Sequence, residues 1–217
     1  MAGDGSQHET MDAESEITLG LLTAVHENSG ITQRSAAKEL GIALGLTNAY
    51  LKRCVRKGYI KVSQIPSNRY AYYLTPQGFS EKARLTAEYL SSSLTFFRQA
   101  RSQCAEALQH CRAQGLRRIA LAGAGDLAEI ATLCARDIEV QLVGTIDPGE
   151  SGSQLAGLPV ANDLSAFGTV DAVLVTDLKA PQETYERLRA ILPAERILTP
   201  ALLHIVRGAP ADGAGPP

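Results

Sequence analysis

The sequence predicts two folded regions of different class, an α+β region followed by an α/β region, with a long helix between them. Three observations predict this. Two short helical patterns precede a strand-turn-strand pattern between residues 31 and 75. A helical pattern then runs from Pro76 to Gly115, and after Arg118 short apolar runs alternate with helical patterns. A chain of 217 residues is long enough for two such cores.

The chain divides into five predicted segments. Residues 1–13 and 207–217 are polar or rich in Pro and Gly, so we expect disordered tails there. Residues 14–75 make the first region, 76–114 the linking helix and 115–206 the second region. The first residues lack the apolar stretch of a signal peptide, and no run approaches the roughly 20 apolar residues of a membrane helix. We therefore expect a cytoplasmic protein with no membrane partner.

Three helices are predicted at the start of the first region. The first begins at Ile17 and ends at residues 28–30. Thr32 is a typical N-cap for the second helix, and Gly41 is its stop signal. The third runs from about Leu44 to Lys57. Two short helices joined at a glycine are typical of a helix-turn-helix.

A β-hairpin and the linking helix follow. Alternating β-branched and aromatic residues flank the turn Pro66–Arg69, which predicts two antiparallel strands. Thr75 can then cap a helix whose first residue is Pro76, a position at which proline is tolerated. The hairpin would be the wing of a winged helix-turn-helix.

The linking helix carries apolar residues at alternating spacings of four and three, which is typical of a coiled-coil seam. We expect homodimerisation through residues 83–111; the alternative is that this helix packs on its own two domains. Arg101 would weaken pairing at a core position, and residues 91–93, all serine, favour a bend. The seam consists of Ala83, Ala87, Leu90, Leu94, Phe97, Arg101, Cys104, Leu108 and Cys111.

Charge is distributed unevenly along the chain. The formal net charge is -2, yet no Asp or Glu occurs from Leu40 to Ser80, a stretch that carries several Lys and Arg residues. This window coincides with the predicted helix-turn-helix and wing, so we expect double-stranded DNA as a partner. The candidate DNA-binding residues are Gln33, Arg34, Ser35, Thr47, Asn48, Lys52, Arg53, Arg56, Asn68 and Arg69.

Different contacts are expected from different members of this set. Asn48 can address adenine and Lys52 guanine, so these two are candidate base readers. Gln33, at the start of the second helix, lies where free amides suit a phosphate, and Arg69 at the hairpin tip suits a minor groove or phosphate.

The run TQRSAAKELGIALGLTNAYLKRCVRKGYIKV, with RYAYYLTPQGFSEKARLTAEYL after it, resembles the MarR-type winged-helix regulators associated with exopolysaccharide gene clusters. The resemblance covers about residues 31–90, and LTPxGxxEKxxLT is its most specific element. It implies a transcriptional regulator of polysaccharide-related genes. Members of that family often end soon after the linking helix, whereas this chain continues.

We expect the second region to be a parallel sheet covered by helices on both faces, because short apolar runs alternate with helical patterns. Its first run is followed by GAGDLA, the context of a Gly-rich dinucleotide fingerprint in a Rossmann-like fold. Asp147 ends the next strand, where a carboxylate can hold ribose hydroxyls; Asp126 opposes a phosphate in the loop. The candidate ligand-binding residues are Gly123, Ala124, Gly125, Asp126, Leu127, Asp147, Thr176 and Asp177.

Two families resemble this region through GAGDLAEI, VQLVGTIDPG, LAGLPV and DAVLVTD. One is the nucleotide-sugar-binding domain of polysaccharide-modifying enzymes, and the other is the NAD(H)-binding domain of the redox-sensing Rex repressors. The first implies a nucleotide-sugar effector, which the exopolysaccharide resemblance also favours. The second implies an NAD(H)-responsive switch, but the long C-terminal helix of Rex proteins has no counterpart here. A third possibility is a scaffold that binds no ligand.

No catalytic or metal-binding pattern stands out. The four cysteines lie in apolar segments without a CxxC pair, so we expect reduced core residues, and the histidines lack ligand spacing. Tyr185 and Arg189 at helical spacing are most simply a surface pair. We therefore expect a regulator rather than an enzyme. An effector would act by binding the DNA-competent and DNA-incompetent states with different affinities.

Overall fold

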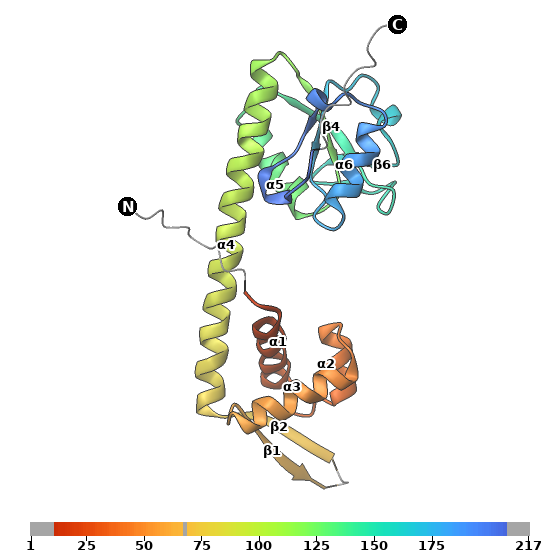
Figure 1. Cartoon of the computed structure of the whole chain (residues 1–217). Coiled ribbons are helices and arrows are strands. Elements are labelled where there is room, and N and C mark those ends of the chain that lie inside the picture. The colour runs from red at the N-terminus through yellow and green to blue at the C-terminus, as the bar shows by residue number, and fades with distance from the viewer. Residues whose placement is uncertain (1–10, 67–68, 208–217) are drawn as a thin grey trace, which may run out of the picture. The chain divides into compact units, whose positions relative to one another are not determined.

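The computed structural model describes residues 11–66 and 69–207, and for Ile65 and Arg69 it describes the backbone alone. The chain divides into two compact units, unit 1 up to Thr95 and unit 2 from Phe96. The division falls inside α4 (Pro76–Ala113), which is one continuous helix (Figure 1).

Unit 1 opens with α1 (Ala13–Glu27), α2 (Gln33–Leu40) and α3 (Leu44–Arg56). The predicted cap at Thr32 is confirmed, because its hydroxyl accepts a hydrogen bond from the Ser35 amide at 3.1 Å. The Ser35 hydroxyl in turn accepts one from the Thr32 amide at 3.0 Å. Gly41 ends α2 with a φ of 65°, the left-handed conformation that glycine adopts at little cost.

Helix α1 begins earlier than predicted. Asp12 caps it by accepting a hydrogen bond from the Ser15 amide at 2.6 Å, and this bond lowers the pKa of the Asp12 carboxyl. Met11 is buried in the core of unit 1. The predicted tail over residues 1–13 is therefore wrong for residues 11–13.

The predicted hairpin is confirmed. Strands β1 (Ile60–Ile65) and β2 (Arg69–Leu74) pair antiparallel and extend beyond the helices of unit 1 (Figure 1). Thr75 starts α4 as expected, since its hydroxyl accepts a hydrogen bond from the Gly78 amide at 3.0 Å and donates one to the Gly58 carbonyl. A Cβ on Gly78 would lie 2.0 Å from the Tyr59 carbonyl oxygen, so the first turn of α4 packs directly on the chain that enters β1.

The core of unit 1 joins all of these elements. It consists of apolar side chains from α1, α2, α3, the hairpin and the start of α4, among which Leu85 of α4 is 1% exposed. The other fully buried large side chains of this unit are Leu21, Leu22, Thr47 and Ile60.

The predicted coiled-coil seam is divided between two environments. Cys104, Leu108 and Cys111 are each 0% exposed and belong to the core of unit 2. These three residues cannot form a dimer seam, so the prediction of a seam over residues 83–111 is wrong for its second half. In the first half, Leu90 is 53% exposed and Leu94 is 55% exposed. The linking helix is therefore a shared element of both units rather than a separate body.

Unit 2 contains a mixed sheet with strand order β5-β6-β4-β3-β7-β8 in the described part of the chain. All adjacent pairs are parallel except β5-β6, which is antiparallel. The strands are β3 (Arg118–Ala122), β4 (Gln141–Ile146), β5 (Gln154–Leu155), β6 (Leu158–Ala161), β7 (Ala172–Val175) and β8 (Ile197–Leu198).

Helices cover both faces of the parallel strands. Helix α5 (Asp126–Ala135) connects β3 to β4, and α6 (Pro181–Arg189) connects β7 to β8 in the opposite direction along the sheet. Right-handed crossovers in opposite directions place the two helices on opposite faces, as Figure 1 shows. The Cys134 thiol of α5 donates a hydrogen bond to the Arg101 carbonyl of α4, so α4 packs beside α5.

Two features of unit 2 differ from the prediction. Strands β5 and β6 were not expected, and the described structure continues one residue past Val206, the last residue of the predicted region. Arg207, assigned to the predicted tail, donates to the Thr199 hydroxyl at 3.0 Å and is part of the described structure. The rest of that predicted tail lies outside the described residues.

All four cysteines are buried and free, as expected for core residues. Burial raises the pKa of the Cys54 and Cys111 thiols to about 11 and that of Cys104 to about 12. Burial also raises the pKa of Cys134. Their thiols therefore stay protonated near neutral pH.

Candidate functional site

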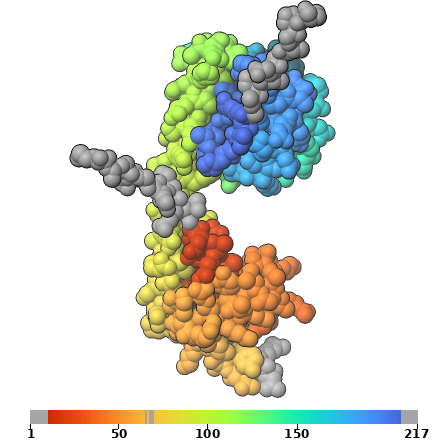
Figure 2. All heavy atoms as spheres, viewed as in Figure 1, coloured from red at the N-terminus to blue at the C-terminus, as the bar shows by residue number. Residues whose placement is uncertain are grey.

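Helix α3 has a buried face and an exposed face. Thr47, Leu51 and Cys54 are buried in unit 1, whereas Lys52 and Arg56 are exposed. The described residues from Leu40 to Pro66 and from Arg69 to Ser80 include no acid, so this exposed face is basic. Figure 2 shows that helices α2 and α3 and the hairpin contribute much of the surface of unit 1 in that view. Such a surface is complementary to a polyanion.

A groove of about 670 Å³ lies between α3 and the hairpin. Its lining comes from the start of α2, from α3 and from both strands, and includes the candidate residues Gln33, Lys52 and Arg56. These three side chains, which are separated in sequence, therefore lie around one hollow. Arg34 and Ser35 are also exposed at the start of α2, although the Ser35 hydroxyl is engaged with Thr32.

Two predicted DNA contacts on α3 are not available as expected. Thr47 is 0% exposed and its hydroxyl donates to the Ala43 carbonyl at 3.2 Å, so its assignment to the DNA-binding set is wrong. Asn48 is half-buried, and its Oδ1 atom is buried without a hydrogen-bond partner. A bidentate contact to adenine needs both the oxygen and the nitrogen of the amide, so Asn48 cannot make it in this arrangement.

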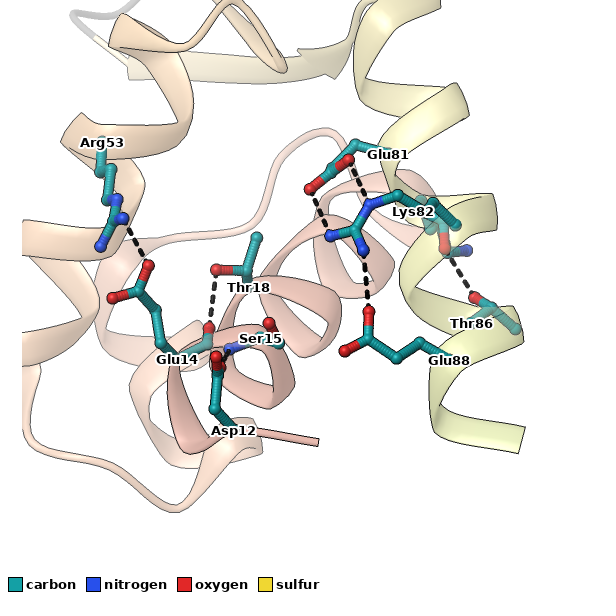
Figure 3. A network of polar contacts seen from close by, with 10 residues as sticks. Asp12, Glu14, Ser15, Thr18, Arg53, Glu81, Lys82, Thr86 and Glu88 are labelled. Atoms are coloured by element: carbon teal, nitrogen blue, oxygen red, sulfur yellow. Dashed lines mark hydrogen bonds and ion pairs between the residues drawn. The ribbon is translucent and has the colours of Figure 1, made fainter. Parts of the chain in front are cut away.

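Arg53 points toward α1, where its guanidinium forms an ion pair with Glu14 (Figure 3). The hydrogen bond that it donates to Glu14 raises the pKa of Arg53. In the same network, Arg84 donates to Glu81 and Glu88 along α4. Arg53 is thus separated from the outward side of α3 that carries Lys52.

The hairpin tip lies mostly outside the described residues. Asn68 lies outside the described residues, and only the backbone of Arg69 is described, as the first residue of β2. Their expected DNA contacts stay predictions.

In unit 2, a cavity of about 240 Å³ opens at the carboxyl ends of β3, β4 and β7. From β3 the chain moves to β4 and β6 on one side of the sheet and then to β7 and β8 on the other side. Ligands of open α/β sheets bind at such a switch point. The structure brings together seven of the eight predicted ligand residues. The lining consists of Gly123, Ala124, Gly125, Asp126, Asp147, Thr176, Asp177, Leu178 and Lys179.

The remaining predicted ligand residue does not reach the cavity. Leu127 is 0% exposed and packs in the core of unit 2, so its assignment as a ligand contact is wrong. Lys179, in contrast, was missed by the sequence analysis. Its position two residues after Asp177, in the loop that follows β7, is a signal in the sequence that points to the site.

Asp147 holds the glycine loop in place. Its Oδ2 atom accepts a hydrogen bond from the Ala124 amide at 2.9 Å, and its Oδ1 atom accepts one from the Gly149 amide at 3.0 Å. Asp147 therefore has a structural task at the site. A carboxylate can accept about four hydrogen bonds, so further donors can still be bound.

Asp177 organises the other side of the cavity. Its Oδ1 atom accepts hydrogen bonds from the Lys179 and Ala180 amides, and its Oδ2 atom accepts one from the Thr184 hydroxyl at 2.7 Å. Burial raises the pKa of Asp177, but these hydrogen bonds outweigh it and the pKa is lowered. Thr176 is buried and donates to the Gly123 carbonyl at 2.8 Å. Thr176 and Asp177 thus hold the backbone of the loops that line the cavity.

The two glycines of the loop differ in their constraints. Gly123 has a φ of 108°, and a Cβ there would lie 2.5 Å from the Asp177 nitrogen and Cα. Gly125 has extended backbone, and a Cβ there would meet nothing within 4 Å. Packing against Asp177 explains why residue 123 is a glycine, whereas none of the described residues fills the space in front of Gly125.

Two features are absent from the described ranges 11–66 and 69–207. No group of three or more His, Cys, Asp or Glu side chains is arranged to hold a metal ion. None of the helices in these ranges combines the length and the apolar character needed to cross a membrane.

Comparison with known proteins identifies one segment. Residues 14–61 match the family model described as winged helix-turn-helix DNA-binding. No curated protein matches the chain.

Solved structures similar to the chain include transcriptional regulators, matched over part of their length. PcaV of Streptomyces coelicolor is 20% identical, with a TM-score of 0.35, over 38% of this chain and 62% of that protein. MepR of Staphylococcus aureus is 28% identical, with a TM-score of 0.34, over 40% of this chain and 64% of that one. A MarR regulator of Methanosarcina mazei is 21% identical, with a TM-score of 0.34, over 38% and 60% respectively. The chain thus spans less than two thirds of these structures.

The matched segment contains α1, α2, α3 and the start of β1, and its exposed residues on α3 are basic. Residues 14–61 are therefore similar to winged helix-turn-helix DNA-binding domains, and the antiparallel hairpin β1-β2 supplies the wing of that fold.

Proposed function

We propose that the protein is a DNA-binding transcriptional regulator of MarR type whose α/β domain binds a nucleotide effector. The observation that carries the DNA-binding part is the acid-free, basic exposed face of α3 in a winged helix-turn-helix domain. Target genes related to surface polysaccharide are proposed from the exopolysaccharide resemblance of residues 31–90. Sequencing of the genomic fragments retained by the full-length protein tests that assignment, and enrichment of unrelated genes would overturn it.

The DNA contact is tested by comparing Lys52→Ala with Arg53→Ala. Lys52 lies on the groove beside α3, whereas Arg53 is paired with Glu14. In a fluorescence titration of a bound duplex against salt, Lys52→Ala should weaken binding and reduce the salt slope by about 1. Arg53→Ala should change the slope less. Equal slopes for wild type and Lys52→Ala would remove Lys52 from the interface.

For the effector we favour a nucleotide sugar. The cavity lining presents three carboxylates and one ammonium group, and carboxylates suit the hydroxyls of ribose and hexose. Lys179 is the lining residue that suits a diphosphate. The alternative is NAD(H), as in Rex repressors.

Mass spectrometry of the denatured, purified protein would name the effector class. A retained nucleotide sugar supports the proposal, retained NAD(H) supports the alternative, and binding of neither to the purified protein would indicate a ligand-free scaffold. Gly125→Val provides the matched variant, because its side chain would enter space that the described part of the chain leaves open. We expect this variant to keep its thermal stability and to lose the ligand.

Regulation requires that effector binding and DNA binding be coupled. We propose that two copies pair through the exposed part of α4 around Leu90 and Leu94, and that the effector binds the DNA-competent and DNA-incompetent states with different affinities. Titrating the duplex with and without the identified nucleotide tests the coupling. Identical DNA affinity at saturating nucleotide would show that the nucleotide does not regulate.

A further inference from the structure

The outward side of α3 is the side opposite the residues that it buries in the core of unit 1. Thr47, Leu51 and Cys54 mark the buried side. At helical spacing, the opposite side carries Gly45, Ala49, Lys52 and Arg56, all of which are exposed. A Cβ on Gly45 would meet nothing within 4 Å, which agrees with an outward position.

In its first two turns this side carries Gly45 and Ala49, which have no hydrogen-bonding side chain. Leu46, which is 41% exposed, lies on the flank of this side, and Leu44, which is 42% exposed, lies at the start of the helix nearer the buried side. The neighbouring polar residues do not substitute, because Thr47 is buried and the Asn48 oxygen is shielded. Lys52 is the first donor along the outward side.

This apolar end lies within a surface that is complementary to DNA in charge. The stretch from Leu40 to Ser80 has no acid, and Lys52 and Arg56 continue the same side of the helix. In the helix-turn-helix mode, the N-terminal residues of the second helix contact the base edges. The apolar group that a base edge displays in the major groove is the 5-methyl group of thymine.

We propose that Leu46 and Ala49 read thymine methyl groups in the major groove, while Lys52 and Arg56 supply the polar contacts beside them. This rests on the proposed DNA-binding function and assigns its specificity. Small residues at positions 45 and 49 let the helix approach the base edges closely. The operator should therefore place thymines where the first two turns of α3 enter the groove.

The experiment uses the full-length protein and a duplex that it selects from a randomised library. That duplex is synthesised again with deoxyuridine at each thymine in turn, which keeps base pairing and removes only the methyl group. We expect about a fourfold loss of affinity for each contacted thymine, the value of burying one methyl-sized group. Contacts of Lys and Arg with guanine should be unaffected.

Variants assign the contact to residues. Leu46→Ala and Ala49→Gly should each bind thymine and deoxyuridine duplexes with more nearly equal affinity. Leu133→Ala is the matched control, since Leu133 is an exposed apolar residue of α5 in unit 2, 45% exposed, and this variant should discriminate as the wild type does. Circular dichroism verifies that each variant is folded.

The outcomes separate the two proposals. Failure to select any duplex would overturn the DNA-binding function itself. Selection of a duplex that binds equally well with deoxyuridine would overturn only the thymine inference. Full discrimination retained by both Leu46→Ala and Ala49→Gly would overturn the assignment to these residues.

Discussion

At the scale of single residues, several side chains of the candidate ligand site form hydrogen bonds within the protein itself. Asp147 holds the Ala124 amide, Asp177 holds two amides and a hydroxyl, and Thr176 holds the Gly123 carbonyl. These hydrogen bonds fix the loop before any ligand arrives, which reduces the ordering cost of binding.

The two loop glycines provide a paired prediction. Gly123→Ala forces a positive φ on alanine and places its Cβ against the Asp177 backbone, so we expect a loss of about 2 kcal/mol or more in stability. Gly125→Ala should cost about 0.5 kcal/mol or less, because its backbone is extended and the space is open. Thermal unfolding of both variants measures the difference; equal losses would contradict it.

Asp177 makes stability depend on pH. Its pKa in the folded protein is below the ordinary value of 3.8, so its contribution is present above that pH and is lost as the pH falls through the folded pKa. Asp177→Ala should destabilise the protein at pH 7 by about 1–3 kcal/mol. The difference from wild type should shrink below pH 3.8.

Denaturant unfolding across pH checks this. Asp137→Ala, at another acidic position in unit 2, should show no such convergence. If the difference in the free energy of unfolding between Asp177→Ala and wild type stayed constant down to the lowest pH measured, the prediction would be wrong. The hydrogen bonds to Asp177 would then not depend on the charge of its carboxylate.

At the scale of elements, hydrogen bonds and close backbone packing connect the hairpin to the start of α4. Thr75 caps α4 and bonds the Gly58 carbonyl, while Gly78 allows the helix to touch Tyr59. The amides of Gly78 and Phe79 at this helix start are therefore both satisfied by Thr75.

Replacement of Thr75 by valine keeps the shape and removes the hydroxyl. We expect Thr75→Val to lower the free energy of unfolding by about 1–2 kcal/mol. Thr86→Val is the matched control, because the Thr86 hydroxyl donates to the Lys82 carbonyl within the helix and caps nothing; its effect should be about 0.5 kcal/mol or less. Chemical denaturation measures both, and equal effects would refute a capping role for Thr75.

At the scale of the whole molecule, α4 contributes to two cores and still exposes large apolar side chains in between. Leu85 lies in one core and Leu108 in the other, whereas Leu90 and Leu94 are about half exposed. Exposed apolar surface of this kind marks interaction sites on soluble proteins.

The double variant Leu90→Glu, Leu94→Glu should therefore shift the protein from dimer toward monomer. Light scattering during gel filtration measures the mass at several concentrations. Gln99→Glu adds charge at an exposed position on another side of the helix and should leave the mass unchanged. A monomeric wild type, or a dimeric double variant, would contradict pairing through this part of α4.

Local signals in the sequence determined the helices, the hairpin and most of the sheet. Thr32, Gly41 and Thr75 act on the backbone within a few residues, so their effects are visible in the sequence. The short apolar runs likewise predicted β3, β4 and β7. Strands β5 and β6 have only two and four residues, too few for a periodic pattern.

Only the tertiary structure decided which side of each helix is covered. The same spacing that suggested a dimer seam places Cys104, Leu108 and Cys111 in the core of unit 2, because apolar periodicity does not name its partner. Tertiary packing also buries Thr47 and Leu127 and places the Arg53 guanidinium beside Glu14. Sequence by itself determined the two fold classes and the basic character of the first, since propensity, capping and charge are local. The membership of each site depended on packing between distant segments, which local patterns do not encode.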